Sequence, residues 1–170
     1  LPLDAGGPAP DNPRGHFEPR AVVALNDAIL AQQGALWLRA GRLDLPAPDT
    51  ALLARMDAAI AESFGSARRI VIKDPRLSLT LPLWRAWLDA RGFRAALLIA
   101  LRDPAEVAHS LARRNGTGAE MAMLSWAQHM LSVLEHSQDM PRLLVPFPGW
   151  TADPGTMLAR IGALCGYKAD

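Results

Sequence analysis

One short apolar run constrains the fold of this chain more than any other feature. Leu97 to Leu101 are five consecutive apolar residues, and Arg102 and Pro104 follow almost at once. Such a run suits a strand that is covered on both faces, and Pro104 suits the first turn of a helix. Arg102 therefore lies where a strand gives way to a helix, with Ser110 eight residues further on. A guanidinium, a hydroxyl and the N–H groups of a helix start could together bind one phosphate.

A simpler interpretation stays open beside this one. Arg102 could pair with Asp103 or another neighbouring carboxylate, and Ser110 could merely pack in its helix. A second segment favours the anion site, because the apolar run from Ile70 to Ile72 is also followed directly by a cation, Lys73. It predicts another strand that ends in positive charge, at the place where open parallel sheets bind ligands.

Hydrophobic periodicity predicts helices between and around these strands. Three apolar strands separated by helices indicate an α/β fold, a three-layer arrangement in which helices flank a mostly parallel sheet. The length of 170 residues suits a single domain over residues 1–170. The expected helices cover about 19–33, 50–64, the region around 81–88, 104–115, 118–137 and 154–166, and the third strand covers 142–147.

Composition excludes several classes of protein. A net charge of +1 provides no electrostatic footprint for nucleic acid or an anionic membrane. The longest apolar run, Ala95 to Leu101, is too short to cross a bilayer, and no signal peptide is visible, so we expect a cytoplasmic protein. Cys165 is the only cysteine, which excludes an intrachain disulfide, and we expect it to pack in the last helix. The histidines lack a metal-ligand spacing with acids, so no metal is predicted.

Several segments together resemble the sulfotransferases that use 3'-phosphoadenosine 5'-phosphosulfate (PAPS), particularly the bacterial members. The strongest piece is the arginine and serine spacing of Arg102 and Ser110. The resemblance covers most of the chain, and the matching segments are Asp11–Glu18, Leu25-Asn26-Asp27, Ile72–Arg76, Leu101–Pro104, Trp126 and Trp150–Leu164. It implies a P-loop-like architecture and transfer of a sulfuryl group from PAPS to an acceptor hydroxyl or amine.

The segment with which this family opens is missing from the sequence. Those enzymes begin with a strand and a K/R-S-G-T type loop for the phosphosulfate, and no such loop occurs here. The glycines at Gly6 and Gly7 are followed by Pro8 and Pro10, which have no N–H groups to offer a phosphate. We therefore expect either an N-terminally incomplete domain or a member that has lost its catalytic loop.

The resemblance assigns roles to four residues. Arg102 and Ser110 would bind the 3'-phosphate of PAPS, and Lys73 would stabilise the charge of the sulfuryl group in the transition state. Many members keep a catalytic histidine two positions after that lysine, where this chain has Pro75. Glu18 is the best alternative base.

Each catalytic assignment has a structural alternative. Lys73 could instead pair with Asp74, and Glu18 could stabilise a helix N-terminus as a first-turn acid. Asp74 and His16 are reserve candidates for the base. Arg76 is expected to anchor a loop or a substrate anion.

Two functions from different classes follow from the sequence. The first is sulfuryl transfer from PAPS, as co-substrate and without a metal, to a small-molecule or glycan acceptor. The second is a non-catalytic sulfotransferase-like module that binds a nucleotide or a partner. The variable loops of this chain carry no group that identifies the acceptor, and the sequence leaves the oligomeric state open.

Overall fold

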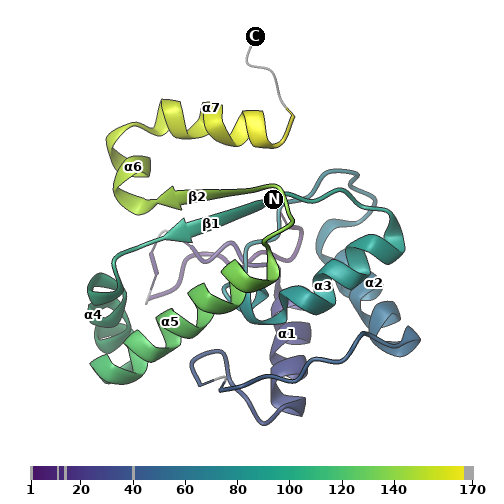
Figure 1. The fold of residues 1–170 in the computed structure, drawn as a ribbon, viewed down its shortest axis with the longest axis horizontal. Coiled ribbons are helices and arrows are strands. Elements are labelled where there is room, and N and C mark those ends of the chain that lie inside the picture. The colour runs from purple at the N-terminus through teal and green to yellow at the C-terminus, as the bar shows by residue number, and fades with distance from the viewer. Residues whose placement is uncertain (1, 11, 14, 40, 167–170) are drawn as a thin grey trace. The chain divides into compact units, whose positions relative to one another are not determined.

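The computed structural model describes residues 2–10, 12–13, 15–39 and 41–166. Over these residues the fold is α/β, with seven helices and a small sheet of two parallel strands (Figure 1). The chain divides into two compact units, Leu1–Arg91 and Gly92–Asp170. The predicted α/β class is confirmed.

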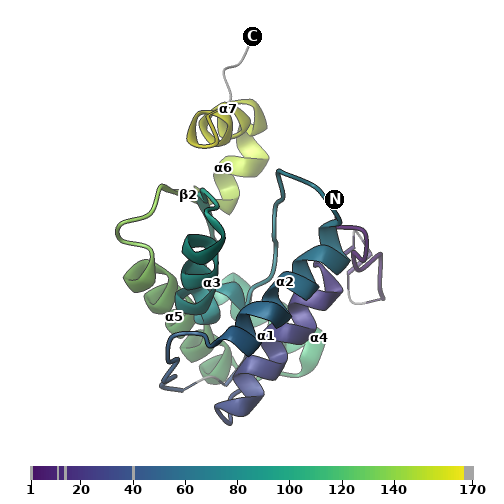
Figure 2. The ribbon, with the colours of Figure 1, turned by 90° about the vertical axis from the view of Figure 1, so that its right-hand side faces the viewer.

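The first unit is built from three helices: α1 (Arg20–Gln32), α2 (Thr50–Phe64) and α3 (Leu77–Arg91). Helices α1 and α2 lie side by side (Figure 2). All three contribute apolar side chains to one buried cluster, as their periodicity predicted. Its buried members are Val22, Leu25, Ile29, Met56, Ala59, Leu83, Trp84 and Trp87.

Local signals fix the ends of α2, whereas a distant residue caps the start of α1. The Asp49 carboxylate accepts a hydrogen bond of 2.7 Å from the Leu52 N–H and caps α2, and Gly65 ends that helix at φ +58°. Helix α1 has no cap from its own N-cap residue, Pro19. Asp4 supplies one from a distance, since its Oδ2 accepts hydrogen bonds from the Ala21 N–H (2.7 Å) and the Ser63 hydroxyl (3.0 Å).

The predicted strand at residues 70–73 is wrong. This segment has no strand or helix assignment, and Val71 is 75% exposed. A strand needs a neighbour to satisfy its backbone groups, and among the described residues no strand pairs with it. Apolar composition alone did not make this segment a strand.

The second unit contains the sheet. Strand β1 (Leu97–Leu101) leads into α4 (Pro104–Asn115) and α5 (Ala119–His136), and β2 (Arg142–Pro146) then returns parallel to β1 (Figure 1). The register pairs Leu97 with Arg142 and Leu101 with Pro146. A parallel pair requires a long crossover connection, which α4 and α5 provide here.

The last segment differs from the sequence prediction in detail. Phe147 was expected to end the third strand, but it begins a short helix, α6 (Phe147–Ala152). Helix α7 (Pro154–Leu164) follows, and Asp153 caps it by accepting a hydrogen bond of 3.0 Å from the Thr156 N–H. Cys165 lies just beyond α7 and is exposed, so the expectation that it packs in the last helix is wrong.

Candidate functional site

The structure brings together the two residues that the sequence predicted to be catalytic. The Lys73 Nζ lies 2.5 Å from the Glu18 Oε1, although the two residues are 55 positions apart. Lys73 also donates a hydrogen bond of 3.3 Å to the backbone oxygen of His16. Glu18 is 19% exposed at its side chain and Lys73 is 57% exposed, so the carboxylate is the more enclosed partner.

Neither structural alternative for these two residues holds in the structure. The ion pair that Lys73 forms is with Glu18 rather than with its neighbour Asp74. Glu18 precedes Pro19, the N-cap of α1, and the first turn of that helix contains no acidic residue.

A tight backbone arrangement positions Glu18. Phe17 has φ +53°, which is unusual for a residue other than glycine, and Gly15 has φ +94°. A Cβ on Gly15 would lie 2.9 Å from the Phe17 ring, so this position requires glycine. Two backbone hydrogen bonds join this segment to Gly6. The Gly6 carbonyl oxygen accepts from the Phe17 N–H (2.9 Å), and the Gly6 N–H donates to the backbone carbonyl oxygen of Glu18 (3.1 Å). Backbone strain of this kind is often found at functional sites.

Glu18 lines an open hollow of about 360 Å³ on the first unit. Two carboxylates, a guanidinium and an imidazole share its wall with small apolar side chains. A small polar molecule could therefore reach the Glu18 carboxylate there. The lining residues are Gly6, His16, Glu18, Arg20, Val23, Ala24 and Asp27.

A buried polar network lies behind Lys73. Asn26, on α1, is fully buried; its Nδ2 donates to the Asp74 Oδ2 at 2.8 Å. Its Oδ1 accepts from the Thr80 hydroxyl (3.0 Å) and from the Trp84 indole N–H (2.9 Å). These bonds fix the residue next to Lys73 against α1 and α3. The sequence placed Asn26 in the resemblance segment Leu25-Asn26-Asp27 but gave it no role, because its buried partners come from distant parts of the chain.

Arg76 completes this network. Its Nε lies 2.5 Å from the Asp27 Oδ1, and its guanidinium also donates to the Asp74 Oδ1 at 3.0 Å. Burial disfavours the charged guanidinium, but its hydrogen bonds to the Asp27 and Asp74 carboxylates, together with their negative charges, outweigh this effect and raise the pKa of Arg76 above its ordinary value. Arg76 thus anchors its loop, which was one of its two predicted roles. Asp74, a reserve candidate for the base, is buried and occupied.

The second pair of predicted residues lies in the second unit. Arg102 follows β1 directly, and its Nε donates to the Glu106 Oε2 at 2.9 Å, one turn along α4. Ser110 is exposed one further turn along that helix, so Glu106 stands between the two in the i, i+4 series. The guanidinium therefore has a carboxylate partner, as the simpler interpretation of the sequence proposed.

The N-terminus of α4 is also occupied. The Asp103 Oδ1 accepts hydrogen bonds from the Ala105 N–H (2.7 Å) and the Glu106 N–H (3.4 Å). These are the helix-start N–H groups that the sequence offered to a phosphate. An anion binding here would compete with the side chains of both Asp103 and Glu106.

Arg102 contacts two aromatic residues, Phe147 and Trp126, and the sequence predicted neither contact. Its guanidinium carbon lies 4.9 Å from the centre of the Phe147 ring. The Trp126 indole N–H, on α5, donates to the Arg102 backbone oxygen at 3.1 Å. Parallel pairing of β1 and β2 brings Arg102 and Phe147 to the same edge of the sheet, a proximity that requires knowing the register.

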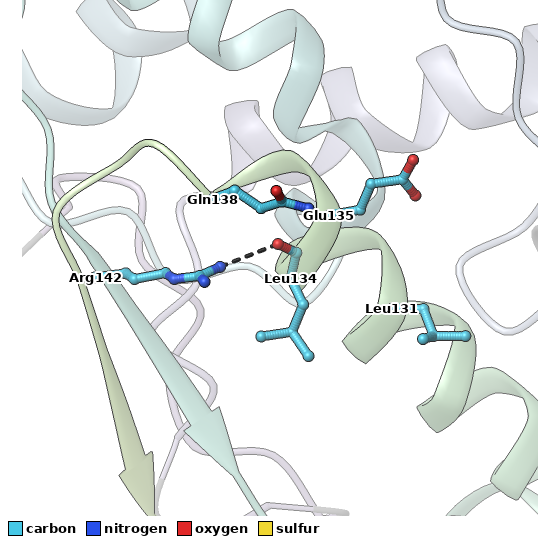
Figure 3. A pocket seen from close by; sticks show the side chains of 5 residues that line it. All are labelled: Leu131, Leu134, Glu135, Gln138 and Arg142. Atoms are coloured by element: carbon cyan, nitrogen blue, oxygen red, sulfur yellow. Dashed lines mark hydrogen bonds between the residues drawn. The ribbon is translucent and has the colours of Figure 1, made fainter.

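A larger hollow of about 760 Å³ lies at the end of α5 and contains none of the four predicted residues (Figure 3). Its lining residues are Leu131, Leu134, Glu135, Gln138 and Arg142. The Arg142 guanidinium donates to the Leu134 oxygen (3.0 Å) and to the Ser137 hydroxyl (2.9 Å). It therefore caps the C-terminus of α5 and is committed to that structural role.

The described residues contain no group of metal ligands and no membrane-spanning helix. No three His, Cys, Asp or Glu side chains there are grouped in a way that could hold a metal ion. Within the part of the chain that the structure describes, no helix has the length and apolar character needed to cross a membrane.

The four predicted residues thus fall into two pairs, one in each unit. Of the segment that carries the resemblance upstream, Asp11 and Arg14 lie outside the described residues. Comparison of the chain with protein-family models, curated proteins and solved structures found no match. The resemblance to sulfotransferases therefore depends on the motifs of this sequence alone.

Proposed function

We propose that this chain is a sulfotransferase that moves a sulfuryl group from PAPS to a hydroxyl or amine of a small molecule or glycan. The observation that carries the proposal is the contact of Glu18 with Lys73 beside an open polar hollow. The resemblance assigns both residues to catalysis from the sequence alone. A base next to a cation is the arrangement that this reaction needs.

The chemistry divides between these two side chains. PAPS supplies the sulfuryl group; the bond from sulfur to the bridging oxygen breaks while a bond to the acceptor oxygen or nitrogen forms. Glu18 takes the proton that the acceptor loses. The Lys73 ammonium stabilises the negative charge that develops on the transferred group, and 3'-phosphoadenosine 5'-phosphate (PAP) leaves.

Binding of the donor is assigned to Arg102 and Ser110, through the 3'-phosphate. Phosphate would replace Glu106 as the partner of the guanidinium. The sequence contains no loop of the K/R-S-G-T type, and apart from Lys73 at the sulfuryl group no residue of this chain is assigned to the phosphosulfate end of the donor.

The proposal includes the layered, P-loop-like architecture of the family, in which helices cover both faces of a wider parallel sheet. Support comes from the apolar strand residues Leu98 and Leu144, which are 43% and 41% exposed. Parallel strands are normally covered on both faces, so this apolar surface suits a strand pair within a larger layered sheet.

A non-catalytic nucleotide-binding or interaction module is the second candidate. It is favoured by Pro75, which stands where many family members have their catalytic histidine. The ion pair of Arg102 with Glu106 favours it as well, because the guanidinium is satisfied without a ligand.

The first experiment is a calorimetric titration of PAP into the full chain and its Arg102→Ala variant. A charge-assisted hydrogen bond contributes roughly 1.5 to 3 kcal/mol, so the variant should bind PAP about ten- to a hundredfold more weakly. Arg113→Ala, on the same helix, is the matched control and should bind like the parent. Equal affinity of the parent and Arg102→Ala would remove the proposed 3'-phosphate site.

The second experiment separates the enzyme from the non-catalytic module. The full chain is incubated with PAPS and a panel of hydroxyl and amine acceptors, and mass spectrometry detects the gain of one sulfuryl group. Glu18→Gln should slow transfer by about 10² to 10⁴-fold and leave PAP affinity unchanged. Glu62→Gln, an exposed carboxylate on α2, is the control. PAP binding without transfer to any acceptor in the parent protein would favour the second candidate.

A further inference from the structure

Arg102 has two side-chain neighbours of opposite character. On one side the Glu106 carboxylate accepts a hydrogen bond from its Nε at 2.9 Å. On the other the Phe147 ring lies with its centre 4.9 Å from the guanidinium carbon. Phe147 begins α6 directly after β2, and the register of β1 with β2 places it at the strand end from which Arg102 emerges.

These two contacts use different parts of the guanidinium. Glu106 accepts from an N–H donor, and a phosphate would need such donors too. Phe147 attracts the cation through the electrons of its ring and occupies no N–H donor. An anion can therefore replace Glu106 while Phe147 stays in place.

The backbone of Arg102 is held independently of its side chain. The Trp126 indole N–H donates to the Arg102 oxygen at 3.1 Å, which fixes the junction between β1 and α4. The Arg102 side chain itself is 42% exposed and that of Glu106 is 56% exposed. The ion pair between them is thus a solvated one, of the kind that is easily exchanged for another partner.

We propose that Phe147 is a positioning residue for Arg102 and that Glu106 is the resting partner that the 3'-phosphate displaces. This inference rests on the proposed function, because it concerns the same phosphate site. Phe147 keeps the guanidinium at the carboxyl edge of the β1–β2 sheet. Glu106 neutralises it until a ligand arrives, at a cost in affinity for that ligand.

The two residues then affect binding with opposite signs. Glu106→Gln removes the competing charge, so PAP should bind about two- to fivefold more tightly. Phe147→Leu removes the ring but keeps an apolar side chain, so PAP should bind about two- to fivefold more weakly. Phe147→Tyr retains the ring and should bind like the parent. If both residues had purely structural roles, Glu106→Gln would not tighten the binding of PAP.

The test combines calorimetric titration of PAP with NMR of the Arg102 Nε–H signal in the full chain. AMP, which lacks the 3'-phosphate, is the reference ligand. Its affinity should be the same for the parent and for each variant. Without ligand, the Arg102 signal should shift in Phe147→Leu but not in Phe147→Tyr, because the ring current of Phe147 acts on it. On saturation with PAP, the signals of the parent and Glu106→Gln should converge.

The outcomes separate the two proposals. Binding of PAP by the parent with unchanged affinity in both Glu106→Gln and Phe147→Leu would overturn this inference and leave the proposed function standing. Failure of the parent to bind PAP would overturn both. A weaker affinity in Glu106→Gln would overturn the role given to Glu106 in the same titration.

Discussion

Two segments of this chain have the same sequence pattern and different structures. Ile72-Lys73-Asp74-Pro75, in the first unit, and Leu101-Arg102-Asp103-Pro104, in the second, each consist of an apolar residue, a cation, an aspartate and a proline. The first follows an irregular, partly exposed run, whereas the second ends a strand. The pattern therefore does not determine the backbone by itself.

The aspartates show what does. Asp74 has no exposed side-chain surface and is hydrogen-bonded to Asn26, on α1, and to Arg76, the residue before α3. Asp103 is exposed and caps α4, the helix that follows it. One aspartate thus joins distant parts of its unit, and the other stabilises only its own helix. The cations differ in the same way. Lys73 is hydrogen-bonded to Glu18, 55 positions away, whereas Arg102 is hydrogen-bonded to Glu106, four positions away.

The largest expected effect on stability comes from Asp74→Ala. Removing this carboxylate leaves the Asn26 amide and the Arg76 guanidinium without their buried partner, which should lower the free energy of unfolding by about 3 to 5 kcal/mol. Urea denaturation of the full chain measures it. Asp74→Asn keeps an acceptor for Asn26 and should lose less. A loss for Asp74→Ala no greater than that for Asp103→Ala would break the comparison.

Asp103→Ala should have a smaller effect. It removes the cap of α4, whose loss costs about 1 kcal/mol, and leaves no buried charge unpaired. The same urea denaturation measures it. Asp103→Ser restores an N-cap hydroxyl and should recover most of the lost stability. A decrease in the free energy of unfolding close to that of Asp74→Ala would show that Asp103 stabilises more than its own helix.

The smallest expected effect on stability comes from Asp57, a carboxylate of the first unit that is paired like Asp74 but is not buried. The Asp57 carboxylate accepts hydrogen bonds from Arg91 (2.7 and 2.9 Å) and from the Trp87 indole (2.8 Å). These bonds lower the pKa of Asp57 below its ordinary value. Because the folded state has the lower pKa, the stabilisation is present above about pH 4 and is lost as the pH falls through the folded value.

Asp57 is 44% exposed, so solvent screens the pair and its contribution should be well under about 1 kcal/mol. Urea denaturation of the parent and of Asp57→Asn at about pH 7 and about pH 2 measures it, and the difference between the two proteins should shrink at the lower pH. Asp89→Asn, an exposed carboxylate on α3, is the control. A difference that grows at the lower pH would contradict the direction of the pKa shift.

Much of the helical structure was predictable because its signals are local. Asp49 and Gly65 delimit α2, and Pro104 and Gly116 delimit α4, as caps and breakers do in most proteins. The site residues Lys73 and Glu18 were predictable as candidates from motifs, and their contact was not. Phe147 could not be connected with Arg102, because the register of β1 with β2 pairs residues that are about 45 positions apart in the sequence.

The sequence by itself determined where locally capped helices such as α2 and α4 begin and end and which cations follow apolar runs, since these depend on neighbours within a few positions. Only the tertiary structure decided which apolar run became a strand, because a strand exists through hydrogen bonds to a partner that the run does not contain. It also decided that Asp74 is buried and Asp103 is not. A carboxylate can leave water only where other groups replace the hydrogen bonds that it gives up, and here the distant Asn26 and the nearby Arg76 do so.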